Sequence, residues 1–221
     1  MIHRQRIWCT LLAAAMPIIG LGAPAARQEY VNAMNAKPDA GRGGLLFATC
    51  AACHGPDGGG TVDGNVPRIA GQHRQVIVKQ ITDYRHARRG DPRMEYIADK
   101  HVLKDAQAIA DVAQFISALE PQTPAGTGRG DALELGRQIY LGRCSACHRR
   151  SGEGDAQAIA PRLAGQHYAY LLRQSNDALE GRRPELASTH NQLLRDLERA
   201  GLQALADVLS RADRTEGQDR R

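Results

Sequence analysis

Four cysteines of this chain form two copies of one short pattern, and a histidine follows each copy at once. The copies are "CAACH" and "CSACH", and their members are Cys50, Cys53, His54, Cys144, Cys147 and His148. In the C-x-x-C-H pattern two thiols add to the vinyl groups of a porphyrin, and the histidine supplies a nitrogen ligand to the iron. The sequence therefore predicts two covalently bound haem c groups.

Three other chemistries use cysteines at this spacing: disulfides, a zinc site with two C-x-x-C pairs, and thioredoxin-like redox pairs. A zinc site does not require a histidine directly after both pairs. A redox pair is expected between a strand and a helix, and no strand pattern surrounds either motif. Two copies inside a longer repeat favour haem attachment.

The repeat extends well beyond the cysteines. "CAACHGPDGGGTVDGNVPRIAGQH" aligns without a gap with "CSACHRRSGEGDAQAIAPRLAGQH", and "QAIADV" matches "QALADV" further on. Each half predicts helices and no strands, and a haem would supply apolar volume in a chain with only 4% aromatic residues. We expect an all-α fold divided into an N-terminal segment (26–38), a first domain (39–120), a linker (121–130), a second domain (131–212) and a disordered tail (213–221).

Residues 1–25 have the pattern of a secretory signal peptide. Arg4 and Arg6 precede an uncharged apolar run, and Ala23 and Ala25 form an A-x-A cleavage pattern. The run is short for a membrane span, so we expect removal of the segment, together with Cys9, and no stable membrane insertion afterwards. Removal lowers the formal charge from +5 to about +3 (5 − 2), which does not suit nucleic-acid binding.

With both C-x-x-C-H motifs, both "P-R-x-A-G-Q-H" stretches and the loop "RRGDPRM", the chain resembles the dihaem class I cytochromes c, the two-domain cytochrome c-four type. The resemblance implies two tandem class I cytochrome c domains and electron transfer in the periplasm. It assigns the distal iron ligand of the first haem to Met94. It also implies that the carbonyls of Pro67 and Pro161 accept a hydrogen bond from the proximal histidines.

The second domain departs from this pattern, because Leu186 stands where the alignment expects methionine. Only Met34 and Met94 lie beyond the signal peptide, and we expect Met34 in a loose N-terminal segment. Three alternatives stay open: an open iron, ligation by His190, or a ligand from elsewhere. If Leu186 to His190 is helical, these two residues lie one turn apart, about 6 Å along the axis. The loop is four residues longer than in the first domain, and we favour His190.

Other polar residues in the repeat are interpreted as structural. His73 and His167 occupy matching positions, and we expect neither to bind iron. The pairs Arg88–Arg89 and Arg182–Arg183 are expected on a solvated face, with haem propionates as the alternative partner.

We therefore predict a periplasmic dihaem cytochrome that transfers single electrons between protein partners such as a membrane complex, an oxidase or a dehydrogenase. Two alternatives remain. One is a haem enzyme or small-ligand sensor with an open second haem, and the other is the cytochrome subunit of a dehydrogenase complex.

Overall fold

The structure, a computed structural model, describes residues 24–212. Within that range the first half contains α1 (Pro24–Asn35), α2 (Ala40–His54), α3 (Arg74–Arg85), α4 (Pro92–Ala98) and α5 (Ala106–Ala118). The second half contains α6 (Leu133–Ile139), the π-helix η1 (Tyr140–Cys144), α7 (Ser145–His148), α8 (Tyr168–Leu179), α9 (Ser188–Arg195) and α10 (Arg199–Arg211). Between residues 24 and 212 the one β pairing is an isolated bridge from Asp155 to Ala160. The expected all-α fold of two tandem domains is confirmed.

The expected signal peptide and C-terminal tail lie outside the described residues, except that Pro24 and Ala25 begin α1. No helix within residues 24–212 is long and apolar enough to cross a membrane.

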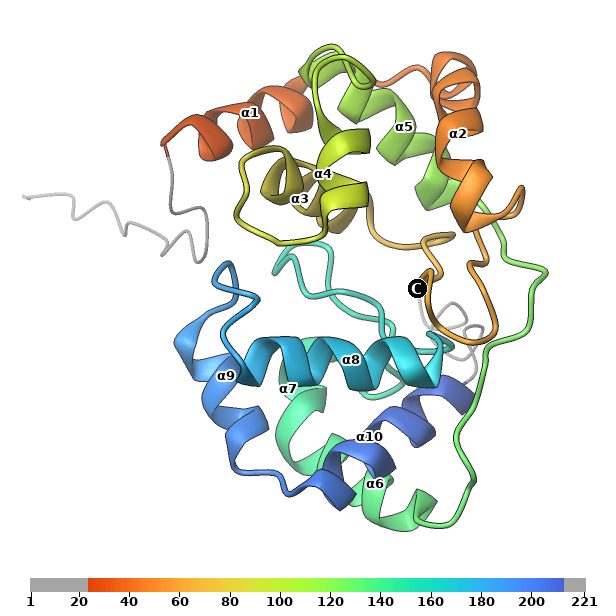
Figure 1. The fold of residues 1–221 in the computed structure, drawn as a ribbon, viewed down its shortest axis with the longest axis vertical. Coiled ribbons are helices and arrows are strands. Elements are labelled where there is room, and N and C mark those ends of the chain that lie inside the picture. Colours follow the sequence, from red (N-terminus) through yellow and green to blue (C-terminus); the bar gives the residue numbers. More distant parts are fainter. Residues whose placement is uncertain (1–23, 213–221) are drawn as a thin grey trace, which may run out of the picture.

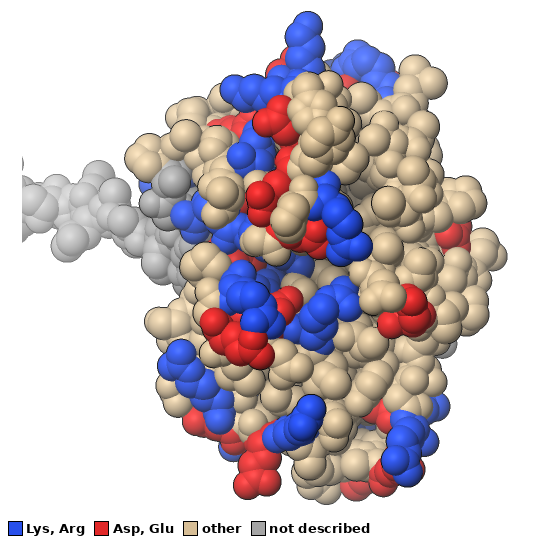
Figure 2. Space-filling view, in the orientation of Figure 1, with Lys and Arg blue, Asp and Glu red and all other residues tan. Residues whose placement is uncertain are grey.

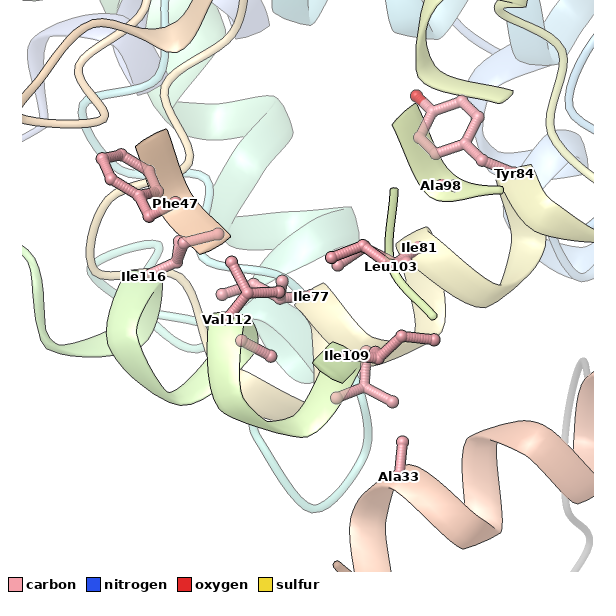
Figure 3. Packing of buried hydrophobic residues seen from close by; sticks show 12 residues of the cluster. Ala33, Phe47, Ile77, Ile81, Tyr84, Ala98, Leu103, Ile109, Val112 and Ile116 are labelled. Carbon is pink, nitrogen blue, oxygen red and sulfur yellow. The ribbon is translucent and has the colours of Figure 1, made fainter. Parts of the chain in front are cut away.

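The first domain is built on a close crossing of α2 and α5. A Cβ atom at Gly43 of α2 would lie 2.2 Å from the carbonyl oxygen of Asp111 in α5, so the two backbones can meet only at a glycine. Figure 3 shows apolar side chains of α2, α3 and α5 packed together in the core of this domain. The crossing positions the end of α2, which carries the first C-x-x-C-H motif.

The second domain repeats this crossing with α6 and α10. A Cβ atom at Gly136 would lie 2.1 Å from the carbonyl oxygen of Ala204. The path from Gly136 to Cys144 is one residue longer than the matching path from Gly43 to Cys50 (144 − 136 = 8, 50 − 43 = 7). The π-helix η1 lies in this stretch and accommodates the additional residue, because a π-turn contains one more residue than an α-turn.

The N-terminal segment forms a packed helix, which corrects the expectation of a loose segment around Met34. Helix α1 packs against α3 and α5, and Ala26 and Ala33 are fully buried. Glu29 pairs with the guanidinium of Arg85 and lies 2.8 Å from the Nε2 atom of His86. A segment rich in polar residues therefore becomes ordered through a buried ion pair with α3.

The two domains face each other along the loops that precede α3 and α8, and the linker runs along one side of both (Figure 1). Charges of both signs are interspersed on the face seen in Figure 2, in keeping with the small net charge.

The arginine pairs Arg88–Arg89 and Arg182–Arg183 do not all lie on a solvated face as expected. Arg182 is exposed and pairs with Asp177 and Glu180. Arg89 is buried, stacks on the Tyr84 ring, and donates a 2.7 Å hydrogen bond to the hydroxyl of Tyr170 in the other domain. The expectation is therefore wrong for Arg89, because the planar guanidinium finds ring and hydroxyl partners that cover it.

Candidate haem-binding sites

Each C-x-x-C-H motif ends a helix, with the histidine as its last residue. His54 ends α2 and His148 ends α7, and both side chains are buried. The chain turns away at once, since the next residues, Gly55 and Arg149, have φ angles of 78° and 64°. The cysteines of the two motifs form no disulfides with one another, and no group of three or more metal-binding side chains gathers within residues 24–212. This arrangement fits thioether attachment better than a shared zinc site.

The two motif histidines are held by the two prolines that the resemblance singles out. The Nδ1 atom of His54 lies 2.9 Å from the carbonyl oxygen of Pro67, and that of His148 lies 2.9 Å from that of Pro161. A carbonyl can only accept, so each Nδ1 carries the proton and donates. Burial lowers the pKa of both histidines. Each imidazole is therefore neutral, with Nε2 left as a lone-pair donor to a metal.

The second motif has an additional support that the sequence analysis did not find. The hydroxyl of Tyr140, in η1, donates to the carbonyl oxygen of Arg149 and, at 3.2 Å, to that of His148. Phe47 occupies the matching place in the first domain and has no hydroxyl. The Tyr140 hydroxyl fixes the turn after His148. The sequence signal for this support was the change from phenylalanine in the first half to tyrosine in the second.

Met94 lies on the short helix α4, as its third residue, and is half-buried against the core of the first domain. The Asp91 side chain caps this helix by accepting from the backbone N–H of Arg93. The charges of Arg93 and Asp91 also act on the pKa of His54, in addition to burial and the bond to Pro67. The loop with Met94 therefore lies within electrostatic range of the first motif histidine.

His190 holds the corresponding position in the second domain. It is the third residue of α9, as Met94 is the third residue of α4. Leu186 lies before this helix and packs against Ala178, Leu194 and Leu202. Leu186 and His190 therefore do not share one helix, because the four additional residues delay the helix start to Ser188.

The rings of His190 and His148 lie close together in an edge-on, T-shaped arrangement, with their centroids 6.5 Å apart and their planes at 69°. The buried Nδ1 atom of His190 has no hydrogen-bond partner. Burial lowers the pKa of His190, and His148 and Arg183 lower it further, so this imidazole is also neutral. Two neutral imidazoles at this separation can act together on one metal.

The separation of the rings tests whether a haem iron fits between them. A metal–imidazole bond is about 2 Å long and the ring centroid lies about 1 Å beyond the nitrogen, so two rings on opposite sides of one metal have centroids about 6 Å apart. The observed 6.5 Å matches this value. The donor set also suits iron, because imidazole and thioether are both axial ligands of c-type haems.

Two all-α domains, each with a C-x-x-C-H motif at a helix end and a buried, proline-bonded histidine, define a dihaem c-type cytochrome. The family described as "Cytochrome c" matches residues 40–120 and 133–207. Cytochrome c4 of Azotobacter vinelandii is 32% identical over 165 residues, covering 67% of this chain and 76% of the relative. A Stutzerimonas stutzeri protein named thiosulfate dehydrogenase electron acceptor is 32% identical, covering 76% and 80%.

Solved structures agree with these relatives. Reduced recombinant cytochrome c4 from Pseudomonas stutzeri superposes with a TM-score of 0.71 at 26% identity, over 80% of this chain and all of that one. Thiosulfate dehydrogenase (TsdBA) from Marichromatium purpuratum superposes with a TM-score of 0.70 at 28% identity, over 80% of this chain and 41% of that one. The chain belongs to the cytochrome c family, in its two-domain, cytochrome c4-like branch. It carries two covalent haem c groups and transfers electrons between redox partners, as the sequence predicts.

Proposed function

We propose that this protein is a periplasmic electron carrier whose two haems have different axial ligands. The iron of the first haem is held by His54 and Met94, and that of the second by His148 and His190. One observation carries the proposal: the ring centroids of His148 and His190 lie 6.5 Å apart, close to the separation expected for two imidazoles that share one metal. Thioether bonds from Cys50, Cys53, Cys144 and Cys147 attach the porphyrins.

Different ligands give the two haems different tasks. Haem iron supplies one-electron chemistry by changing between its ferric and ferrous states. A thioether sulfur favours the ferrous state, whereas a second imidazole favours the ferric state, so the first haem has the higher potential. An electron that enters through the second domain therefore moves downhill to the first domain.

The proposed ligand pair in the second domain also favours a carrier over a haem enzyme. If His148 and His190 both held the second haem, they would leave no position at its iron for a substrate or a small ligand. His190 comes from the first turn of a helix rather than a loose loop, and its ring has no competing hydrogen bond at Nδ1. Both facts support a carrier over an enzyme or a gas sensor.

The location and the partners are proposed from the sequence pattern and from two relatives. Residues 1–25 have the pattern of a secretory signal peptide. Two relatives are named thiosulfate dehydrogenase electron acceptors, one of them from Thiomonas intermedia at 30% identity. We propose that this chain likewise accepts electrons from a periplasmic dehydrogenase and passes them to a further acceptor.

Replacing His190 by alanine tests the second ligand pair. The ferric optical and electron paramagnetic resonance spectra of the His190→Ala holoprotein should gain a high-spin component from one haem, and its ferrous form should bind carbon monoxide. Asn191→Ala, one residue away on α9, is the matched control and should keep two low-spin haems. A wild-type protein that already has one high-spin haem would instead support the open-iron alternative.

A further inference from the structure

The domain interface is built from a symmetric exchange of hydrogen bonds between the two "AGQH" stretches. His73 lies with Nε2 2.8 Å from the carbonyl oxygen of Glu153, and His167 lies with Nε2 2.7 Å from that of Gly59. The expectation that neither histidine binds iron agrees with these contacts. The neighbouring glutamines, Gln72 and Gln166, make a second exchange that the sequence analysis did not anticipate.

Gln166 of the second domain binds the peptide group between Pro67 and Arg68, which supports His54 of the first domain. The carbonyl of Pro67 accepts from His54, and the N–H of the same peptide group, on Arg68, donates to the Oε1 atom of Gln166 at 3.0 Å. The Nε2 atom of Gln166 donates back to the carbonyl of Arg68 at 2.8 Å. One unbroken chain of hydrogen bonds thus links the His54 ring to a side chain of the other domain.

A matching series of hydrogen bonds links the histidine of the second domain to a glutamine of the first. The carbonyl of Pro161 accepts from His148, and the N–H of that peptide group, on Arg162, donates to the Oε1 atom of Gln72 at 2.9 Å. The Nε2 atom of Gln72 donates to the carbonyl of Arg162 at 3.0 Å. Each motif histidine is therefore supported by a peptide group that a glutamine of the opposite domain clamps on its far side.

The surroundings make such a chain sensitive to small changes. Gln166 is buried, and the guanidinium of Arg68, also buried, donates to the carbonyls of Gly165 and Thr123. Hydrogen bonds in series polarise one another in a weakly polar interior, so an acceptor on the peptide N–H makes the carbonyl of the same group a stronger acceptor. A stronger acceptor on Nδ1 gives the imidazole more donor strength toward its metal, which favours ferric iron.

We propose that Gln72 and Gln166 are positioning residues that tune, across the domain interface, the proximal histidine of the opposite domain. Gln166 sets the donor strength of His54, and Gln72 sets that of His148. Each haem's potential then depends on contact with the other domain, so a change at the interface, such as partner docking, alters both. The inference rests on the proposed function, because it takes His54 and His148 as the proximal ligands.

A crossed pattern of redox shifts tests the proposal. Gln166→Leu removes the acceptor from the Arg68 N–H, so the first haem's potential should rise while the second haem's stays nearly constant. At a fixed applied potential the ferric-to-ferrous ratio of the first haem should fall about two- to five-fold. Gln72→Leu should shift the second haem instead. Gln166→Glu keeps an oxygen acceptor for the Arg68 N–H, so the potential of the first haem should lie much closer to the wild-type potential than it does in Gln166→Leu.

A control separates this tuning from loss of the interface. His73→Leu removes a cross-domain hydrogen bond of similar length and leaves the hydrogen bonds from the N–H groups of Arg68 and Arg162 in place. It should leave both potentials nearly unchanged. Equal shifts of both haems in every variant, or a shift confined to the haem of the substituted domain, would overturn the proposal.

A nuclear magnetic resonance experiment reads the chain directly. The nitrogen-15-resolved Nδ1–H resonance of His54 should move in Gln166→Leu and stay in place in Gln72→Leu. If this resonance does not belong to an iron-bound histidine in the wild-type holoprotein, the ligand assignment itself fails. If it does, and the crossed pattern is missing, only the tuning role fails.

Discussion

Replacing His190 by methionine should convert the second haem into a copy of the first. Met94 and His190 are each the third residue of a short helix after the loop, and the ring centroid of His190 already lies 6.5 Å from that of His148. A methionine side chain reaches about as far as a histidine, so the sulfur can replace the imidazole without a large backbone movement. We expect the potential of the second haem to rise by on the order of 100 mV, about 2.3 kcal/mol for one electron.

The assay is a spectroelectrochemical titration of the holoprotein together with its ferric far-red spectrum. His190→Met should roughly double the weak far-red band of a methionine-ligated haem and narrow the gap between the two potentials. Leu186→Met is the matched control: Leu186 packs in an apolar cluster before α9, so a methionine there should change neither quantity. If Leu186→Met narrows the gap and His190→Met does not, the assignment of α9 as the ligand helix is wrong.

Three further predictions follow from single residues. Met94→Ala should remove the wild-type far-red band and lower the potential of the first haem; a surviving band would exclude Met94 as the ligand. Gly136→Ala places a Cβ atom against the carbonyl of Ala204 in α10, so the free energy of unfolding measured with denaturant should fall by about 1–3 kcal/mol. Gly142 has open space around it, so Gly142→Ala should leave the stability unchanged or raise it by up to about 1 kcal/mol. Similar losses of stability in both variants would refute the close crossing of α6 and α10. Burial alone would raise the pKa of Asp57, but hydrogen bonds from Thr123, Gly59 and Gln122 outweigh it and hold that pKa below its ordinary value. The folded-state pKa is thus depressed, so this stabilisation is present above about pH 4 and disappears as pH falls through the folded pKa; acid titration of unfolding midpoints should show a smaller fall in Asp57→Asn than in wild type.

The haem motifs and most helices were predictable because they depend on local patterns. The spacing of the cysteines predicts the attachment chemistry, and the helices expected in each half are present, α3 and α5 among them. The repeat predicts two domains of the same plan. These features need only a pattern of residue types along the chain.

The features that sequence reasoning missed depend on contacts between distant residues. The sequence analysis favoured His190 as a ligand but did not find its place on the helix, because an alignment on the loop proline pairs Met94 with Leu186. In the structure Met94 and His190 are each the third residue of a helix, since the helix start moved with the insertion. The hydrogen bonds of Gln72 and Gln166 to the opposite domain join residues that are 90 and 98 positions apart in the sequence. A repeated glutamine beside a repeated histidine was the available signal, but only packing of the two domains gives it a partner.

A redox titration of the wild-type holoprotein, followed at the absorption bands of both haems, tests the central claim most directly. The account predicts two separate one-electron steps, with the haem that shows the far-red methionine band reduced first and the bis-histidine haem reduced at lower potential. Two haems that titrate together at high potential, each with a methionine band, would contradict the account.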